Sequence, residues 1–412
     1  MLDQTIILEW LTFATRWLHV IVAIAWIGSS FYFIALDLGL RKTKHLPKKA
    51  FGEEWQVHGG GFYHITKYLV APSTLPEHLI WFKWESYATW LTGFTMLILV
   101  YYLGADLYLI DANVLDVPAW GAILISLSSL TIGWYIYDLL CKSPIGKSQN
   151  TLMLVLFGVL VVMAWAYTQL FTGRAAMIHL GAFTATIMSA NVFFIIIPNQ
   201  KIVVADLKAG RTPAVHLGAQ AKQRSLHNNY LTLPVIFLML STHYPLAFAT
   251  QYNWVIASLV FLIGVVIRHY FNSKHAHKGK PNWTWLVAAI LFVIIIFISS
   301  IPSQIDEKEM AVSKAVKPFL QSSNFEQVNN IVMGRCSMCH TAEPFYEGVN
   351  RPPKNVILDS EIAIAKQAKN IAIQAGYTHA MPPANVSYME ESERQIIIDW
   401  YKQSLANSGR WL

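Results

Sequence analysis

The first 302 residues consist of long apolar stretches separated by short polar connections. Eight of the stretches reach the roughly 20 residues that a helix needs to cross a bilayer. The expected spans are 7–36, 80–104, 119–140, 151–171, 175–198, 226–248, 252–271 and 282–302. Most are bounded by Pro, Gly or charged residues, which favour helix ends. The pattern predicts an all-α fold with a polytopic eight-helix transmembrane bundle over residues 1–302.

Basic residues collect in every second connection between these stretches. The connections after the first, third, fifth and seventh stretches hold 16 Lys and Arg residues, whereas those after the second, fourth and sixth hold only Arg174. Connections rich in Lys and Arg stay in the cytoplasm. The pattern therefore predicts an N-terminus outside the cytoplasm, and eight crossings return the C-terminus to the same side.

The chain after residue 302 has a different character. Residues 303–322 are polar and are expected to form a linker, and residues 323–412 have the size of one small domain. Three helices are predicted there from capping residues and apolar periodicity, over 324–335, 360–374 and 389–406.

The amino-acid composition also indicates that residues 1–302 and residues 303–412 lie in different environments. The chain is 54% hydrophobic and only 13% charged, which exceeds the apolar share of ordinary soluble domains. Residues 303–412 hold 11 basic and 12 acidic residues, and the rest of the chain holds 20 and 12. The positive charge lies mostly in the connections of the bundle, so no nucleic-acid partner is needed to explain it. The lipid bilayer is the partner that this composition predicts.

The run Cys336-Ser337-Met338-Cys339-His340 carries the most specific chemistry in the chain. A C-x-x-C pair followed at once by His is the attachment signature of a c-type haem. The two thiols bond the porphyrin, and the imidazole ligates the iron. A zinc site or a redox dithiol are the alternatives, but zinc needs two further ligands and the third cysteine, Cys141, is distant in sequence.

The motif predicts one covalent haem c in a class I cytochrome c domain over residues 323–412. Met381, in the run Ala380-Met381-Pro382-Pro383, is the expected second axial ligand, because a thioether raises the potential of the iron. His379 is the competing ligand. Haem c is attached on the outer face of bacterial inner membranes, so the motif and the charge pattern predict one orientation, with both termini periplasmic.

Ionisable residues inside membrane spans are functional candidates by default. At about 1.5 Å per residue, His179 and His243 lie at similar depth near the outer ends of their helices, and His19 lies deeper. These three are candidate ligands of a b-type haem. Histidines of this kind also serve as hydrogen-bonding contacts between helices, and the sequence leaves both alternatives open.

A second set of polar residues is expected near the cytoplasmic ends of the helices, where it can bind a polar substrate. Its members are Lys83, Glu85, Asn191, His227, Asn228, Asn229, Arg268 and His269.

Long stretches of the bundle resemble the membrane-bound, cytochrome c-linked urate oxidase (urate hydroxylase) family. The motifs are His58 to Tyr63 (HGGGFY), Lys67 to Pro72 (KYLVAP), Leu75 to His78 (LPEH), Trp81 to Glu85 (WFKWE), Ser225 to Pro234 (SLHNNYLTLP) and Ser241 to Pro245 (STHYP). The order of an eight-helix domain followed by a cytochrome c also fits. The resemblance covers essentially the whole chain.

The resemblance implies oxidation of urate to 5-hydroxyisourate, with electrons passing to the cytochrome domain and on to a soluble or membrane cytochrome or a terminal oxidase. An anionic purine needs cationic and amide donors, and Lys83, Arg268, Asn191, Asn228 and Asn229 offer them. Glu85, His227 and His269 are the candidate catalytic residues, in the role of general base.

The sequence leaves two alternative functions open. One is another membrane dehydrogenase, such as a quinol-oxidising cytochrome subunit. The other is a non-enzymatic, membrane-tethered electron shuttle. Tethering needs only one membrane helix, so eight spans with buried charge argue against the shuttle. A substrate near the cytoplasmic face also requires a relay, because electrons must cross most of a hydrocarbon core of about 30 Å.

Overall fold

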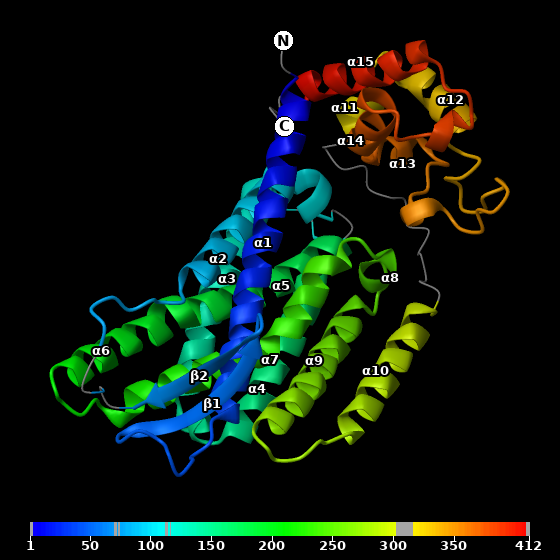
Figure 1. Ribbon diagram of the computed structural model, residues 1–412. Helices are drawn as coiled ribbons and strands as arrows, with labels where there is room; N and C mark the ends of the chain where they lie inside the picture. The colour runs from blue at the N-terminus through cyan, green and yellow to red at the C-terminus, as the bar shows by residue number, and fades with distance from the viewer. Residues whose placement is uncertain are drawn as a thin grey trace.

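The computed structural model describes residues 3–69, 72, 75–111, 114–115, 117–301 and 316–408. They form a helical bundle with a smaller helical body at one end (Figure 1). The helices of the bundle are α1 (Gln4–Gly39), α2 (Trp84–Leu97), α3 (Ala119–Lys142), α4 (Gln149–Thr168), α5 (Gly173–Ala190), α6 (Ile197–Lys208), α7 (Val215–Ser241), α8 (Pro245–Phe248), α9 (Asn253–His275) and α10 (Trp283–Ser299). We call the end next to the smaller body the domain end, and the opposite end the hairpin end.

Five helices in the described residues are long and apolar enough to cross a membrane. They are α1, α3, α4, α9 and the continuous helix Gly173–Lys208, in which a π-helical segment joins α5 to α6. The most apolar window of α1 contains no buried residue. An outward-facing apolar surface of this kind suits hydrocarbon and not water, so these helices are compatible with a membrane protein.

The other three expected spans coincide with less regular or shorter helices. The span 80–104 contains α2 and a π-helical continuation, and the span 282–302 contains the 17-residue α10. The span 226–248 covers the second half of the more polar α7, which ends at Ser241, and the short α8. The all-α class is confirmed. The eight crossings stay a prediction.

Helix α5 is the centre of the bundle, with eleven of its 18 residues buried. Two glycines let neighbouring helices come close. A Cβ on Gly133 of α3 would lie 2.0 Å from the Phe183 ring of α5, and a Cβ on Gly264 of α9 would lie 2.5 Å from Pro234 of α7. Any larger residue would separate these helices.

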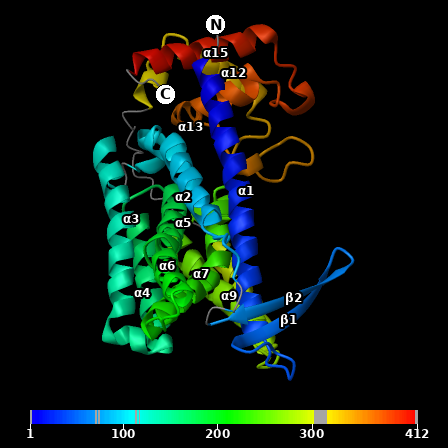
Figure 2. The same cartoon turned by 60° about the vertical axis from the view of Figure 1, so that its left-hand side comes forward.

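The connection after α1 forms a β-hairpin that the sequence pattern did not predict. Strands β1 (Ala50–His58) and β2 (Gly61–Tyr68) pair antiparallel, and Gly59 and Gly60 make the turn at positive φ. Buried Glu53 bonds Thr43 and, at 2.7 Å, His64, which attaches the hairpin to the chain that follows α1. Figure 2 shows the hairpin at the end of the bundle away from the smaller body.

The smaller body has its own apolar core. It comprises α11 (Lys317–Leu320), α12 (Phe325–Arg335), α13 (Glu361–Lys366), α14 (Ala368–Ile371), a π-helical segment (Ala372–Tyr377) and α15 (Glu391–Asn407). The helices predicted over 324–335 and 389–406 are confirmed as α12 and α15. The helix predicted over 360–374 is divided into α13, α14 and the π-helical segment, and Ser360 caps α13 by accepting from the Ala363 N–H. Val316 and Phe319 belong to the same core, so the described end of the expected linker packs into this domain. Residues 303–315 of the linker lie outside the described residues.

Helix α1 reaches from the hairpin end of the bundle to this C-terminal domain. Its 36 residues span about 54 Å, well beyond a hydrocarbon core of about 30 Å. Asp3 pairs with Lys402 of α15 at 2.8 Å and accepts from the Tyr377 hydroxyl at 3.1 Å, and Glu9 pairs with Lys369 at 2.8 Å. The first turns of α1 therefore dock the domain onto the bundle (Figure 1).

Candidate functional site

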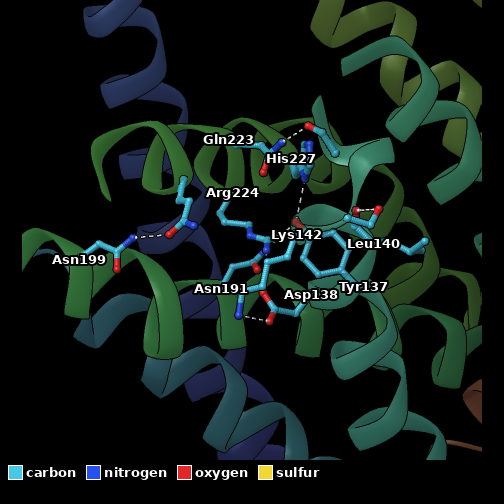
Figure 3. A network of polar contacts seen from close by, with 12 residues as sticks. Tyr137, Asp138, Leu140, Lys142, Asn191, Asn199, Gln223, Arg224 and His227 are labelled. Carbon is cyan, nitrogen blue, oxygen red and sulfur yellow. Dashed lines mark hydrogen bonds and ion pairs between the residues drawn. The ribbon is translucent and has the colours of Figure 1, made fainter. Parts of the chain in front are cut away.

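A buried network joins α3, α5 and α7 towards the hairpin end of the bundle. The Tyr137 hydroxyl lies 2.8 Å from His227 Nδ1, and Asn191 donates to it at 3.0 Å (Figure 3). Asn191 also donates to Asn228 Oδ1 at 3.1 Å, and Asn228 donates to the Met188 carbonyl at 2.9 Å. Three of the expected residues, Asn191, His227 and Asn228, thus meet in one place.

The direction of these hydrogen bonds follows from the donors present. The Gln149 amide nitrogen can only donate, and it lies 3.3 Å from His227 Nε2, so Nε2 accepts and Nδ1 carries the proton. Nδ1 then donates to the Tyr137 oxygen, which also accepts from Asn191. Neither His227 nor Asn191 therefore takes the hydroxyl proton of Tyr137.

A charged group borders this network. Arg224 donates to Asp138 at 2.7 Å, and Lys142 pairs with the other carboxylate oxygen at 2.6 Å (Figure 3). The guanidinium carbon of Arg224 also lies 4.9 Å from the centroid of the Tyr137 ring. Two cations and one anion leave a positive charge beside the phenol. Arg224 Nε and Nη1 and Asn191 Oδ1 are buried with no hydrogen-bond partner in the described chain.

A cavity of about 340 Å³ adjoins the network between α3, α4, α5, α7 and α9. Tyr137, His227, Asn150 and Tyr230 supply polar groups to its wall, and the rest of the lining is apolar. Small-molecule sites commonly have this form, with volumes from roughly 300 Å³ and few polar groups. The cavity therefore gives a ligand access to the Tyr137–His227 pair.

A second network occupies the opposite side of α7. Arg268 donates to Asn229 at 3.2 Å and to Asn272 at 3.1 Å, and its guanidinium lies 4.0 Å from the Phe31 ring centroid. No carboxylate among the described residues lies within ion-pair distance of this buried cation, and Asn229 Nδ2 has no acceptor. Since an unpaired buried charge is unfavourable, the arrangement suits an anion.

The remaining members of the expected cytoplasmic cluster lie elsewhere. His269 is exposed and its ring packs at 6.1 Å from Trp283 of α10. Lys83 and Glu85 are half-buried at the start of α2, where Lys83 lies 5.9 Å from the Trp84 ring. Ser86 contacts Ser189 at 3.1 Å, which puts this turn against α5 close to Asn191. No hydrogen bond between described residues joins Lys83, Glu85 or His269 to either network.

The three candidate b-haem ligands occupy different environments. His179 is fully buried, donates to the Ala175 carbonyl at 2.8 Å, and is enclosed by the rings of Tyr101, Tyr167 and Phe171. His19 bonds Thr92 at 3.0 Å between α1 and α2. His243 is exposed beyond the end of α7. No contact among the described residues joins any two of these histidines.

In the C-terminal domain, the Cys-x-x-Cys-His motif forms a tight turn directly after α12. His340 N–H donates to the Cys336 carbonyl at 3.0 Å, and His340 Nδ1 donates to the Val356 carbonyl at 2.9 Å. This hydrogen bond fixes the ring and leaves Nε2 as the lone-pair nitrogen, as an axial ligand of iron requires. Burial raises the pKa of Cys336 to about 11 and also raises the pKa of Cys339.

Protonated thiols of this kind disfavour a redox dithiol, whose reactive cysteine has a lowered pKa. In the described part of the chain, no group of three or more His, Cys, Asp or Glu side chains is placed to hold a metal ion. The turn that presents Cys336, Cys339 and His340 fits covalent haem attachment, which stays a prediction.

Hydrogen bonds hold the backbone of Met381 at both its N–H group and its carbonyl group. Met381 N–H donates to the Gln374 carbonyl at 2.8 Å, and Arg394 donates to the Met381 carbonyl at 2.9 Å. Met381 also packs against the core of the domain. The competing residue, His379, lies on the surface 3.3 Å from Glu391. Met381 stays the predicted second ligand, and the structure gives its side chain a fixed, partly buried position.

Sequence reasoning missed several residues of the two networks. They are Tyr137, Asp138, Gln149, Arg224 and Asn272. Asp138 lies inside the span expected at 119–140, so the rule that charges in membrane spans are functional candidates could have found it. Arg224 lies before the span expected from residue 226, yet α7 already begins at Val215. Tyr137 gave no signal, because tyrosine is common in such helices.

Comparison with known proteins gives a match at the family level. Residues 5–299 match a family model described as "Urate oxidase N-terminal". Neither the curated proteins nor the solved structures contain a match to this chain. The matched range covers α1 to α10, with the hairpin and both polar networks, and ends before the C-terminal domain.

Proposed function

Because the chain belongs to the urate oxidase N-terminal family, we propose that it oxidises urate to 5-hydroxyisourate inside the helical bundle and passes the electrons to a c-type haem on its C-terminal domain. The family indicates an oxidoreductase that acts on urate. To this family-level function the proposal adds a location in the membrane and a path for the electrons.

One observation supports the placement of the substrate: Arg224 and Asn191, which both contact Tyr137, carry buried polar atoms without partners, and a cavity adjoins Tyr137 and His227. Arg224 Nε and Nη1 are free donors and Asn191 Oδ1 is a free acceptor. Buried polar groups in proteins are nearly always hydrogen-bonded. Urate is a flat anion with carbonyl acceptors and N–H donors along its edges, so it complements both kinds of atom.

The proposed reaction balances with water as the source of oxygen. Urate and one water give 5-hydroxyisourate, two protons and two electrons, and no dioxygen is reduced at this site. Water attacks C5 of the purine and must lose a proton. His227 lines the cavity, and its Nε2, which accepts from the Gln149 amide at 3.3 Å, would take this proton as a general base once water replaces that amide. Tyr137 and Asn191 hold the imidazole and its tautomer in place.

The Arg268 network is proposed to favour the anionic state of the substrate. A buried guanidinium without a carboxylate partner produces a positive potential that low-dielectric surroundings screen weakly. Arg268 thus contributes mainly to binding, whereas His227 contributes to the chemical step. Glu85 remains a candidate base in a half-buried position at the start of α2.

The C-terminal residues fit the haem that the proposal needs. Cys336 and Cys339 would hold a c-type haem covalently, and His340 and Met381 would ligate its iron. The haem would supply one-electron chemistry, which would let the two electrons from urate pass on to a respiratory cytochrome or terminal oxidase. We place the domain on the periplasmic face of a bacterial inner membrane.

The relay between the two ends of the bundle is a separate part of the proposal. A b-type haem held by His19, His179 or His243 would shorten the electron path. Pyridine haemochrome analysis of the purified protein decides this point, because b-type and c-type haem give different bands. One c-type haem per chain and nothing else would remove the b-type haem from the proposal.

The decisive experiment adds urate anaerobically to membranes that contain the protein. We expect the reduced c-haem absorption band to appear, and His227→Ala to abolish it while dithionite still reduces the haem. Glu85→Gln tests the alternative base. If urate leaves the band unchanged in the wild type, the proposed function is wrong.

A second candidate function is oxidation of a quinol. The mostly apolar wall of the 340 Å³ cavity favours it, because a quinone ring with a hydrocarbon tail would fit such a lining. The same anaerobic assay separates the candidates: a quinol analogue, and not urate, would then reduce the haem. Reduction by neither compound would favour a tethered electron shuttle.

A further inference from the structure

A second cavity, of about 180 Å³, lies at the junction between the bundle and the C-terminal domain. One wall comes from the first turns of α1 and from the segment after α2, including Leu99, Leu103 and Leu107. The other wall comes from α13, α14 and α15. The family match gives this cavity no role, and neither network described above reaches it.

Two arginines line the cavity, Arg16 of α1 and Arg174 of α5. Within the described residues, neither one lies within ion-pair distance of a carboxylate, and Arg174 Nε is buried without an acceptor. The carboxylate that also lines the cavity, Glu9, is already paired with Lys369 at 2.8 Å. The junction cavity therefore carries uncompensated positive charge.

Aromatic side chains place this cavity at the surface of the membrane. Trp17, Trp120 and Trp165 are all exposed. Trp120 and Trp165 lie near the domain ends of α3 and α4, and Trp17 lies in the fourth turn of α1, which extends beyond the bundle to the C-terminal domain. Exposed tryptophans at helix ends mark the headgroup level of a bilayer. Arg16 precedes Trp17 in α1, so the two arginines lie at the level where lipid phosphates are found.

We propose that Arg16 and Arg174 bind the phosphate group of a phospholipid in the junction cavity. Paired guanidinium groups suit a phosphate, because each can donate two parallel hydrogen bonds to its oxygens. A volume of about 180 Å³ is below that of sites for whole drug-sized molecules, roughly 300 Å³ and more. The cavity thus takes the headgroup, while Leu99, Leu103 and Leu107 contact the start of the acyl chains.

Such a lipid would touch both bodies of the protein. Its phosphate binds the bundle through the two arginines, and its headgroup lies against α14 and α15. Bound lipid therefore adds to the polar contacts at the start of α1 and stabilises the docked position of the C-terminal domain. The occupant of the site is either a phospholipid or free phosphate, since both present the same oxygens.

The test uses the full-length protein in detergent with three probes: phosphatidylglycerol in mixed micelles, diacylglycerol in the same micelles, and inorganic phosphate. Native mass spectrometry counts bound lipid, and thermal unfolding measures stabilisation. We expect phosphatidylglycerol to bind and raise the Tm, and diacylglycerol to do neither. Equal stabilisation by inorganic phosphate would support the site and assign it to free phosphate.

The variants Arg16→Gln and Arg174→Gln should each weaken phosphatidylglycerol binding about tenfold, the effect of one lost charge-assisted hydrogen bond. Arg174→Lys keeps the charge and should retain much of the binding, which separates loss of the site from misfolding. Arg351→Gln, an exposed arginine away from the cavity, is the matched control. Unchanged lipid binding in the Arg16→Gln, Arg174→Gln double variant, or equal binding of diacylglycerol, would overturn the proposal.

Discussion

Three consecutive residues of α7 show that neighbouring positions on one helix can belong to different polar networks. His227 and Asn228 face α3 and α5, where they meet Tyr137 and Asn191. Asn229 points to the other side of the helix and meets Arg268. Successive helix residues differ by about 100° in direction, since a turn takes 3.6 residues. One short polar run therefore serves two networks with different chemistry.

Tyr137→Phe removes the hydroxyl that holds His227 and keeps the ring. We expect the urate-dependent rate of haem reduction to fall by about 10²- to 10⁴-fold, the usual contribution of acid–base groups. Stopped-flow absorbance under anaerobic conditions measures the rate. Tyr135→Phe, two residues away on an exposed part of α3, is the control and should keep the wild-type rate. Equal rates in both variants would remove Tyr137 from the site.

Arg268→Gln tests the separation of binding from chemistry. Loss of the buried positive charge should raise the KM for urate about tenfold or more and change kcat little, because the residue acts on the anion in both the ground state and the transition state. Steady-state kinetics with an artificial electron acceptor measures both constants. A fall in kcat at unchanged KM would place Arg268 in the chemical step.

Asp138→Asn tests the charged group beside Tyr137. Asp138 and Arg224 are both buried, and removal of one partner of such a pair costs about 3–5 kcal/mol. Asp206→Asn, which breaks the exposed pair with Arg211, should cost at most about 1 kcal/mol. Thermal unfolding in the same detergent compares them. Equal losses of Tm would contradict the structural role given to the buried pair.

The cysteines differ in expected role. Cys336→Ala and Cys339→Ala should each weaken or abolish covalent haem attachment, whereas Cys141→Ala, in buried surroundings on α3, should leave it intact. Haem-dependent peroxidase staining after denaturing electrophoresis measures the covalent bond. Stained protein in a double Cys336, Cys339 variant would rule out attachment at this motif.

At the scale of elements, α1 is the connection between the two parts of the molecule. It packs along the bundle and then meets α15 through Asp3 and Lys402. Burial alone would raise the pKa of Asp3, but the ion pair with Lys402 and the hydrogen bond from Thr5 outweigh it and lower the pKa. The bond to Asp3 raises the pKa of Lys402.

The signs of these shifts predict how docking depends on pH. A carboxylate with a lowered pKa contributes stability above its unfolded value near 3.8, and that stability is lost as the pH falls through the lower folded pKa. Lys402 contributes below about 10.5, and its contribution is lost as the pH rises through its higher folded pKa. Docking should therefore be constant from about pH 5 to pH 9 and weaken outside this range.

Crosslinking between α1 and α15, followed over pH, measures this docking. Asp3→Asn should abolish the acid-side change and lower the crosslinking yield at neutral pH. Glu9→Gln, which affects the second contact with Lys369, should lower the yield without removing the change at acid pH. An identical acid profile in Asp3→Asn would show that another group controls docking.

At the scale of the whole molecule, the hairpin and the C-terminal domain lie at opposite ends of an apolar bundle (Figure 2). The proposed orientation places them on opposite faces of the membrane. In a Cys141→Ser background, a membrane-impermeant maleimide should label Glu391→Cys in intact spheroplasts and should label exposed Val57→Cys only after lysis. Labelling in the reverse order would invert the topology.

Much of the fold could be predicted from the sequence. Long apolar stretches become helices because a chain in hydrocarbon must satisfy its own backbone hydrogen bonds, and this requirement acts locally along each segment. The predicted spans 119–140 and 151–171 accordingly match α3 and α4 within a few residues. In the C-terminal domain, α12 and α15 were predicted equally well from caps and periodicity, whereas the helix predicted over 360–374 is divided into shorter segments. The hairpin was missed, because its strands alternate only weakly between apolar and polar residues.

The sequence determined part of the candidate site, and the tertiary structure decided the rest. Sequence determined that polar side chains lie on α5, α7 and α9, that a Cys-x-x-Cys-His motif follows the bundle, and that Asn191, His227 and Arg268 are candidates. Only the tertiary structure decided that Tyr137 and Arg224 complete one network, that Arg268 belongs to another, and that His269 belongs to neither. Side-chain direction around a helix and the partner that each helix meets depend on packing between distant segments. A local pattern of residues does not contain that information.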